Sequence, residues 1–412
     1  MTSKMNIKIE LDKKSKATEL QFDIKGDTET GLDKSIINSI RRTLLSTIPT
    51  VAFRTESDNS DIIIKKNNAS LHNEFLADRI GLIPLYINPS DYHKQYLFHL
   101  NVVSNQSEPI TTITANDFDI YPLTKTVDPL LLESIDFNDY DKENKLSQKE
   151  KDTIFKPFKF NGKNNYCIIT ELKSTNSSTR QEIEMYGVPS LSYAYENAKW
   201  QSVSRATYAF KRDDKLFDKI FQEKVKMNEI AKSNQAKFKK ELFIAESERY
   251  FHRDKNLQPY WYTFNIDSVH FMKSKELFIT ANQLLIENLE KLIEELPKLV
   301  LQEKSFLTLE QLDEGIFKII MTGFDDTIGN ILQNYIATNL INDSSIMSVC
   351  GYKKTHPLED TIFFIMSLNK NNKVFQLNKP QQVVAIIEQL NEACNGLIQI
   401  FSIVIKEAEQ KL

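Results

Sequence analysis

Cysteine, glycine and long apolar runs are scarce in this sequence, and each scarcity excludes a class of protein. The 412 residues include 10 glycines and 3 cysteines, which are Cys167, Cys350 and Cys394, and there is no Cys-x-x-Cys pair. This argues against a secreted disulfide framework and against a zinc or iron–sulfur site built on a local cysteine motif. No apolar run reaches the ~18 residues of a membrane span, and residues 1–10 carry no signal-peptide core. We therefore expect an intracellular protein that does not cross a membrane.

Motifs for nucleotide binding and hydrolysis are also missing. The sequence has no G-x-x-x-x-G-K-[ST], G-x-G-x-x-G, G-x-S-x-G or H-E-x-x-H. The histidines do not cluster at the spacing of metal ligands, and we expect structural roles for all of them. They are His72, His93, His99, His252, His270 and His356. The sequence therefore predicts no metal, no cofactor and no catalytic residue in this chain.

The charge is nearly balanced, with 52 Lys+Arg against 56 Asp+Glu and a formal net charge of -4. This excludes a protein that works mainly by coating phosphates. Segment 211–248 is highly charged, and Leu216, Phe217, Ile220 and Phe221 mark it as an amphipathic helix. Its lysines leave open a second interpretation, an independent nucleic-acid-binding protein, beside that of a solvated helix face.

Hydrophobic periodicity predicts a similar order of elements at both ends of the chain. Each end has a strand, a short helix, further strands and a long helix with one apolar stripe. The first half is predicted to contain strands at 8–11, 20–24, 51–53 and 61–64, a helix over 33–47, and a helix capped by Ser70 and ended by Gly81 as a left-handed cap. The second half is predicted to contain strands at 262–266, 317–321, 347–352 and 361–367, a helix from Ser274 to Pro297, a helix over 327–340 and a last helix from Pro380.

Neither long helix can bury its apolar stripe alone, because each stripe needs a facing surface. The economical solution is that the two ends of the chain pack on one another as an intramolecular pseudo-dimer. The predicted fold class is α+β, with a two-part dimerisation domain, an inserted β-rich domain and a small C-terminal α/β-sandwich partner domain.

Two stretches of sequence resemble a known family. Residues 38–45 (NSIRRTLL) lead through 49–52 (PTVA) to 71–85 (LHNEFLADRIGLIPL), and this resembles the signature of RNA polymerase alpha-type subunits. Residues 196–200 (ENAKW) are similar to the Ala-Lys-Trp motif of the archaeal and eukaryotic members, although the usual Ser-Pro after it is Gln-Ser here. Near the other end, residues 325–330 (DDTIGN), 351–352 (GY) and 356–359 (HPLE) resemble, in order, the motifs of the small partner subunit.

The resemblance implies a non-catalytic assembly subunit of a DNA-directed RNA polymerase, fused to its small partner as in large cytoplasmic DNA viruses. The expected partners are the two largest polymerase subunits and smaller ones, with DNA and RNA contacted only through the complex and no separate small partner needed. Magnesium would belong to the catalytic subunit. The location would be the virus factory and virion in the cytoplasm, or alternatively the nucleus. The predicted domains are 1–50 plus 198–300 (with a charged helical excursion at 211–257), an insert at 51–197, a linker at 301–312 and a partner domain at 313–412.

The resemblance also assigns residues to two surfaces. Those expected to contact the large subunits are Arg41, Arg42, Glu74, Phe75, Arg79, Gly81, Lys199 and Trp200. Those expected in the intramolecular interface are Ile36, Ile37, Ile40, Leu44, Leu285, Leu289, Leu292, Thr327, Gly329, Asn330, His356, Pro357, Leu358, Val384, Ile387 and Phe401.

Residues 116–120 (NDFDI) half-resemble the aspartate motif that holds catalytic magnesium in the large polymerase subunit. Such chemistry needs several converging carboxylates, and the Gly and third Asp are missing here. Asp117 and Asp119 therefore support only a third hypothesis, a metal-dependent nucleotidyl transferase, against a simple turn at a strand edge.

Overall fold

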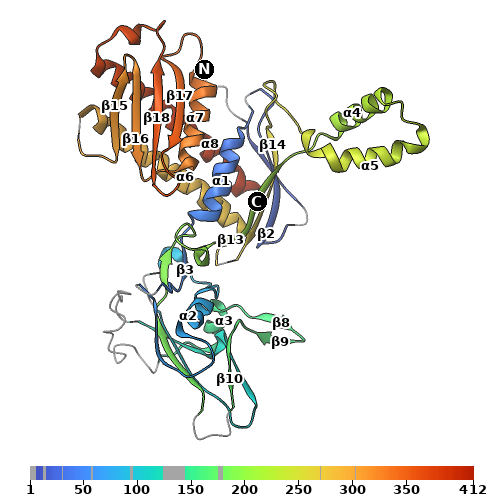
Figure 1. Ribbon diagram of the computed structural model, residues 1–412, viewed down its shortest axis with the longest axis vertical. Helices are drawn as coiled ribbons and strands as arrows, with labels where there is room; N and C mark the ends of the chain where they lie inside the picture. Colours follow the sequence, from blue (N-terminus) through green and yellow to red (C-terminus); the bar gives the residue numbers. More distant parts are fainter. Residues whose placement is uncertain are drawn as a thin grey trace. The chain divides into compact units, whose positions relative to one another are not determined.

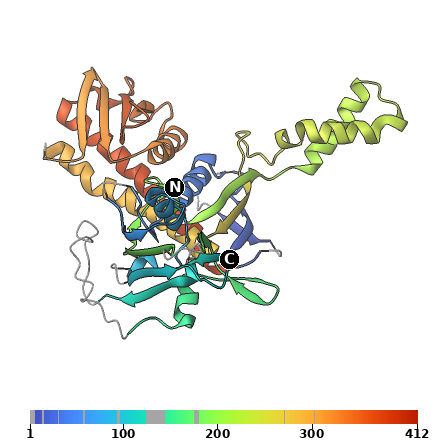
Figure 2. The ribbon, with the colours of Figure 1, turned by 60° about the horizontal axis from the view of Figure 1, so that its bottom comes forward.

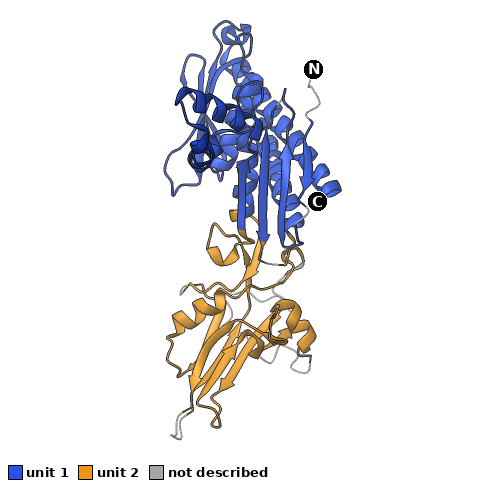
Figure 3. Cartoon of the chain, turned by 90° about the vertical axis from the view of Figure 1, so that its right-hand side faces the viewer, with its two compact units in different colours: residues 1–44, 205–267, 274–412 blue, residues 45–204, 268–273 orange. Residues whose placement is uncertain are grey.

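The computed structural model describes residues 6–12, 15–29, 31–56, 59–92, 96–123, 144–174, 180–269, 271–301 and 303–412. His93 and His270 lie outside the described residues. The chain is a mixed α/β protein with several small sheets, and it divides into two compact units (Figure 3). Unit 1 comprises residues 1–44, 205–267 and 274–412, and unit 2 comprises residues 45–204 and 268–273.

The first half of unit 1 is a four-stranded sheet with two helices (Figure 1). Its strands lie in the order β1-β2-β14-β13, and alternate residues of β2 and β14 are buried, as expected of a sheet with one covered face. Phe22, Phe264 and Phe278 form its centre, with ring centroids 4.9–5.9 Å apart. The elements are β1 (Lys8–Leu11), β2 (Glu19–Lys25), α1 (Lys34–Ser46), β13 (Val203–Phe210), β14 (Trp261–Ser268) and α6 (Ser274–Leu301).

The C-terminal part of unit 1 is a second four-stranded sheet, ordered β15-β16-β18-β17, with two helices. Phe317, Ile319 and Met321 of β16 are buried at alternate positions on its covered face. The last helix, α8, packs along α6, so the two long apolar stripes share one core. The elements are β15 (Leu307–Asp313), β16 (Ile316–Thr322), α7 (Asp326–Tyr335), a π-helical turn (Ile336–Leu340), β17 (Met347–Lys354), β18 (Thr361–Leu368) and α8 (Lys379–Lys411).

The charged segment 211–248 forms two helices rather than the single helix predicted. They are α4 (Asp214–Met227) and α5 (Gln235–Glu246), which run back along each other as a hairpin and extend away from the sheet of unit 1 (Figure 2). The break lies at Asn228 and Glu229, where Glu229 adopts a left-handed backbone with φ 46°. A left-handed residue cannot continue a right-handed helix, so the chain reverses there.

Unit 2 holds one four-stranded sheet, ordered β4-β11-β5-β7, and three two-stranded ones, β12-β3, β10-β6 and β8-β9. Phe98, Phe118 and Phe155 pack together in its core, with ring centroids 5.7–6.0 Å apart. The elements are β3 (Thr50–Ala52), β4 (Ile62–Asn67), α2 (Asn73–Gly81), β5 (Tyr96–Val103), β6 (Ile110–Thr114), β7 (Phe118–Pro122), α3 (Gln148–Ile154), β8 (Phe158–Phe160), β9 (Lys163–Asn165), β10 (Ile168–Lys173), β11 (Glu182–Gly187) and β12 (Ser190–Ser192).

Two predicted helix boundaries and one predicted backbone conformation are wrong, although α2 does end at Gly81 as predicted. Helix α2 starts after His72, not Ser70, because the Asn67 amide donates to the Leu71 carbonyl and holds the chain in a turn. Gly81 does not adopt the left-handed conformation predicted for it, since the described glycines with positive φ are at 31, 162, 315 and 323. Helix α6 passes through Pro297 to Leu301, because a proline one turn from the helix end removes only one hydrogen bond there.

The predicted linker at 301–312 overlaps a strand. β15 begins at Leu307, which is 2% exposed and pairs with Met321 of β16. Unit 2 spans residues 45–204 and 268–273, whereas the predicted insert spans residues 51–197. The predicted partner domain, residues 313–412, lies in unit 1 together with residues 1–44 and 205–267.

Candidate subunit-docking site

Helix α2 presents a polar and partly apolar outer face that a partner can reach. Its inner residues Leu76, Ala77 and Ile80 are buried in the core of unit 2. On the outer side, Glu74 is exposed and the Phe75 side chain is 63% exposed. Leu82, just past the helix, is 67% exposed. Exposed apolar side chains on a rigid helix are the usual anchors of a protein interface.

Arg79 fixes α2 to the strand beneath it. Its Nε donates to the Ile169 carbonyl at 2.6 Å and its second guanidinium nitrogen donates to the Ile168 carbonyl at 3.2 Å. Both carbonyls belong to β10. The guanidinium thus holds the outer face of α2 in place, whether or not it also meets a partner.

Gly81 is required by a close approach rather than by a left-handed turn. A Cβ at this position would lie 2.8 Å from Cγ2 of Thr55 and 3.1 Å from the Phe53 carbonyl oxygen. Thr55 Oγ1 in turn donates to the Asp78 carboxylate of α2 at 2.7 Å and accepts from the Lys199 ammonium at 2.6 Å. Residues 53–55 therefore connect the end of α2 to the Ala-Lys-Trp segment.

Lys199 and Trp200 lie inside the domain, behind the surface that they were predicted to form. The Lys199 side chain is 5% exposed and Trp200 is fully buried. The indole Nε1 of Trp200 donates to the Ser190 carbonyl at 3.2 Å, and the Trp200 carbonyl accepts from Thr50 Oγ1 at 2.6 Å. Both side chains therefore support this face from inside unit 2, and their predicted contact with a large subunit stays a prediction.

Charged groups complete this arrangement. Arg54 donates to both carboxylate oxygens of Glu196, at 2.9 and 3.2 Å, and its guanidinium lies 5.3 Å from the centre of a Trp200 ring. Partial burial raises the pKa of Glu56, but hydrogen bonds from its own and the Thr55 backbone and the nearby Lys199 ammonium outweigh this, so the pKa is lowered overall. The lowered pKa favours the charged form of Glu56 beside the Lys199 ammonium.

In unit 1, the paired arginines of α1 make contacts within the chain. Arg42 Nε donates to Thr327 Oγ1 at 3.0 Å, and another guanidinium nitrogen donates to the Asp325 carboxylate at 3.2 Å. Asp325 is the N-cap of α7 and accepts from the Thr327 backbone at 2.9 Å. Arg41 donates to Asn38 Oδ1 on its own helix at 3.0 Å. We call the Arg42–Asp325–Thr327 group the clamp, since it joins α1 to the start of α7.

Most residues predicted for the intramolecular interface are buried in unit 1. In α1, α6 and α8 the buried ones are Ile36, Ile37, Ile40, Leu44, Leu285, Leu289, Leu292, Ile387 and Phe401. Thr327 is 9% exposed and Asn330 is half-buried. Gly329 faces Tyr352, where a Cβ would lie 2.5 Å from the ring. These residues come from both ends of the chain and lie in the same compact unit.

Four predicted interface residues lie at the surface instead. His356, Pro357 and Leu358 lie in the turn between β17 and β18, and Leu358 is 88% exposed. Val384 is 38% exposed because the buried stripe of α8 runs through its neighbour Val383. The three residues of this turn are all exposed, so none of them is buried in the core of unit 1.

Each of the two aspartates in the 116–120 stretch has a partner within the chain. Asp117 accepts from the Thr114 backbone at 2.7 Å in a capping box, and Asp119 pairs with Lys145 at 2.5 Å. Over the described part of the chain, no group of three or more His, Cys, Asp or Glu side chains is arranged to hold a metal ion. A search of the same residues finds no helix long and apolar enough to span a membrane.

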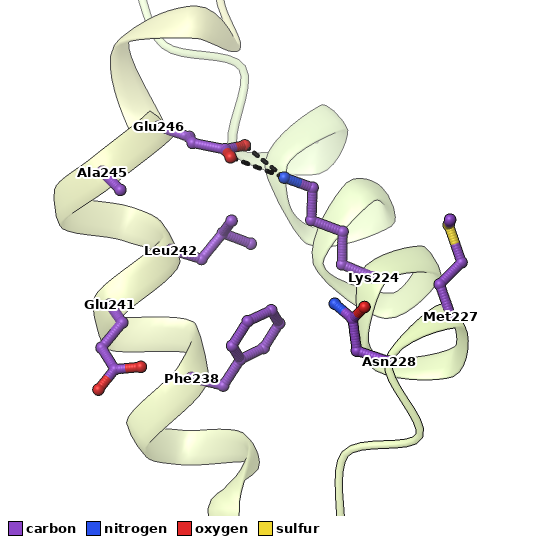
Figure 4. A pocket seen from close by; sticks show the side chains of 8 residues that line it. All are labelled: Lys224, Met227, Asn228, Phe238, Glu241, Leu242, Ala245 and Glu246. Carbon is purple, nitrogen blue, oxygen red and sulfur yellow. Dashed lines mark hydrogen bonds and ion pairs between the residues drawn. The ribbon is translucent and has the colours of Figure 1, made fainter.

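The α4–α5 hairpin has its own small core and a cavity of about 450 Å³ between the helices (Figure 4). Lys224 donates to both carboxylate oxygens of Glu246 at the mouth of this cavity, at 2.8 and 2.6 Å. Lys239 pairs with Asp218 at 2.6 Å. Carboxylates thus neutralise Lys224 and Lys239, while Lys226 and Lys240 are exposed, and the nucleic-acid interpretation of segment 211–248 stays a prediction.

Comparison with known proteins finds one family model and several short matches to polymerase subunits. The family model of the RNA polymerase Rpb3/Rpb11 dimerisation domain matches residues 28–289. The subunit Rpo3 of Methanosphaera stadtmanae is 42% identical over 67 residues, which is 15% of this chain and 23% of that protein. The rpac1 subunit of polymerases I and III from Dictyostelium discoideum is 34% identical over 90 residues, 22% of this chain and 23% of that protein.

Human RPAC1 is 34% identical over 70 residues, which is 17% of this chain and 17% of that protein. The chain thus spans less than a quarter of the length of these curated relatives. The family model, in contrast, covers more than half of the chain and includes both α1 and most of α6. This chain belongs to the RNA polymerase Rpb3/Rpb11 dimerisation-domain family of alpha-type subunits.

Proposed function

We propose that this chain is a non-catalytic assembly subunit of a multisubunit DNA-directed RNA polymerase. It would provide a rigid platform on which the two largest subunits and smaller subunits dock. The observation that carries the proposal is the braced outer face of α2, where Glu74, Phe75 and Leu82 are exposed on a helix that Arg79 and Gly81 hold in place. Relatives with this domain carry polymerase-subunit names, which agrees with it.

A charge placed on the exposed apolar residue tests the docking role. Phe75→Asp should weaken association with the large subunits by about 2 kcal/mol or more, as for the loss of an aromatic interface anchor. The assay is co-expression of the full chain with both large subunits, followed by tag purification and quantification of each subunit. Since Phe75 is 63% exposed, the isolated variant should remain folded.

Ile244→Asp is the matched control, because Ile244 is a 79% exposed apolar residue on helix α5. It should leave co-purification unchanged. Equal recovery of the large subunits with wild type and Phe75→Asp would contradict the placement of the docking site on α2.

We further propose that the C-terminal part replaces a separate small partner, so that the chain is an intramolecular pseudo-dimer. Support comes from the shared packing of α6 against α8 and from the clamp, which links residues 283 and 285 positions apart. Joining the two parts replaces a bimolecular encounter with a high effective concentration.

Cutting the chain tests this arrangement. A protease site inserted between the exposed residues Glu303 and Lys304 should be cleaved while both fragments continue to co-elute in gel filtration, because the buried stripes hold them together. The uncut protein is the control. Separate elution of two folded fragments would show that the C-terminal part does not act as the partner.

A fusion of this kind resembles the polymerases of large cytoplasmic DNA viruses. We propose on this basis that the chain acts in a cytoplasmic virus factory and is packaged in virions, with the nucleus as the alternative. Immunolocalisation in producing cells, together with proteomics of purified virions, distinguishes the two.

A further inference from the structure

Strands β8 and β9 form a hairpin that stands apart from the other sheets of unit 2 (Figure 1). Its turn is Asn161-Gly162, and both residues have positive φ, 51° and 75°. This is the geometry of a two-residue type I′ turn, which Asn-Gly strongly favours. The register pairs Phe158 with Asn165 and Phe160 with Lys163. The ribbon is therefore locally well specified, although no described strand covers either of its edges.

One face of this hairpin carries two exposed aromatic rings. Phe158 is 61% exposed and Phe160 is 65% exposed. Because alternate residues of a strand share a face, both rings point the same way, roughly 7 Å apart along the strand. Directly opposed partners share a face as well, so Lys163 and Asn165 lie beside the rings. Side chains as exposed as these contribute little to the hydrophobic core of unit 2. Exposed apolar groups that lie side by side often mark a binding surface.

The charged residues of the chain segment that carries the rings have a single sign. Residues 153–170 contain Lys156, Lys159 and Lys163 but no Asp or Glu, in a chain with more acidic than basic residues. The Lys156 ammonium lies over the Tyr86 ring at 4.1 Å. Lys159 and Lys163 are exposed, and neither forms an ion pair with any residue that the structure describes. Their charge is available to a ligand.

We propose that the face formed by Phe158, Phe160, Lys163 and Asn165 binds single-stranded nucleic acid. Two neighbouring bases of an extended strand would stack on the two rings, and the Lys163 ammonium beside the rings would attract a phosphate. Lys159 alternates with the rings and lies on the opposite face of the ribbon, so it adds only to the positive charge nearby. The Asn165 amide can hydrogen-bond a base edge. A stable protein partner would need about 800 Å² on each side, more than this eight-residue ribbon offers, whereas a few nucleotides fit it. This proposal does not depend on the docking role of α2.

The test is fluorescence anisotropy of a labelled oligothymidylate of about 12 nucleotides titrated with the full chain. The double variant Phe158→Leu/Phe160→Leu keeps the apolar character and removes the rings, and it should weaken binding by about tenfold or more. Phe158→Tyr/Phe160→Tyr keeps the rings and should bind as wild type. Both side chains that are replaced are exposed, so circular dichroism should show unchanged folding.

Salt dependence separates the lysines from the rings. Lys159→Gln/Lys163→Gln should reduce the slope of log affinity against log salt concentration by about 0.7, the share of the one lysine on the ring face, whereas the Leu variant should keep the wild-type slope. Lys226→Gln/Lys240→Gln, which removes the same charge from exposed sites on the α4–α5 hairpin, is the matched control and should change neither affinity nor slope.

Several results would overturn the proposal. They are equal affinity for a duplex of the same length, full binding by the Leu variant, a loss caused only by Lys226→Gln/Lys240→Gln, or no binding at all. If the Leu variant bound the oligonucleotide normally and Phe158→Ser/Phe160→Ser lost the large subunits in co-purification, the hairpin would be a protein anchor instead. The co-purification assay with Phe75→Asp gives its answer independently, so the two proposals can fail separately.

Discussion

Replacing Arg42 by alanine distinguishes an internal clamp from an outward-facing contact. The guanidinium bridges Thr327 and Asp325 at 3.0 and 3.2 Å and joins α1 to the N-terminus of α7. In contrast, Arg41 bonds only to Asn38 on its own helix among the described hydrogen bonds. If the clamp matters, Arg42→Ala loosens α7 in the isolated chain and Arg41→Ala does not.

The size of the effect follows from the exposure of the pair. The side chains of Arg42 and Asp325 are 40% and 44% exposed, so the ion pair contributes only about 0.2–1 kcal/mol. The hydrogen bond from the guanidinium to the Thr327 hydroxyl adds about 1 kcal/mol. The expected loss is therefore ~1–2 kcal/mol, which corresponds to a factor of roughly 5–30 in the local opening equilibrium of α7.

Hydrogen–deuterium exchange of peptides that cover α7 measures this local opening. Arg42→Ala should accelerate exchange by that factor and Arg41→Ala should not. Asp325→Ala also removes the N-cap, at about 1 kcal/mol, and the double variant Arg42→Ala/Asp325→Ala should lose less than the sum of the single variants. Unchanged exchange of α7 in Arg42→Ala, together with reduced recovery of the large subunits, would refute the clamp and favour the outward contact.

Two further predictions concern titratable groups. Burial raises the pKa of the thiols of Cys350 and Cys394 to about 12, whereas Cys167 is exposed. Alkylation of the native chain at neutral pH should therefore modify Cys167 alone. Mass spectrometry shows whether one thiol or three react. Hydrogen bonds, first from Lys224, lower the pKa of Glu246 from its ordinary value of 4.5, so the stability that this carboxylate gives the α4–α5 hairpin is present above pH 4.5 and is lost as the pH falls through the lowered pKa. Exchange of α4 and α5 peptides should accelerate over that acid range, and the same acid response in Glu246→Gln would contradict this.

Local patterns predicted the strands and long helices of unit 1 well, because burial on one face imposes a period on the sequence. The predicted strand at 8–11 agrees with β1 residue for residue, and the predicted last helix from Pro380 begins one residue late. Errors arose where a distant partner decides. Leu307 was assigned to a linker, since only its pairing with Met321 makes it part of a strand.

The docking role of α2 stays a prediction. The motif at 71–85 led to α2, and its exposed residues are those that a partner can reach. Sequence alone could not show that Lys199 and Trp200 support this face from inside, because their burial depends on residues about 145 positions away, such as Thr55 and Thr50. The β8–β9 hairpin was missed altogether, although Asn161-Gly162 between alternating aromatic residues was a signal for it.

The sequence by itself determined that no local cysteine or histidine motif for a metal exists here, that the charge is balanced, and that two long helices carry stripes that need a surface to cover them. Composition and periodicity are local properties, so they follow directly from the sequence. Only the tertiary structure decided that Arg42 bonds to Asp325 and Thr327, that Trp200 is buried in unit 2, and that the two phenylalanines of the β8–β9 hairpin are exposed. Which groups remain free for a partner depends on which others pack against them, and that is settled only when distant segments meet.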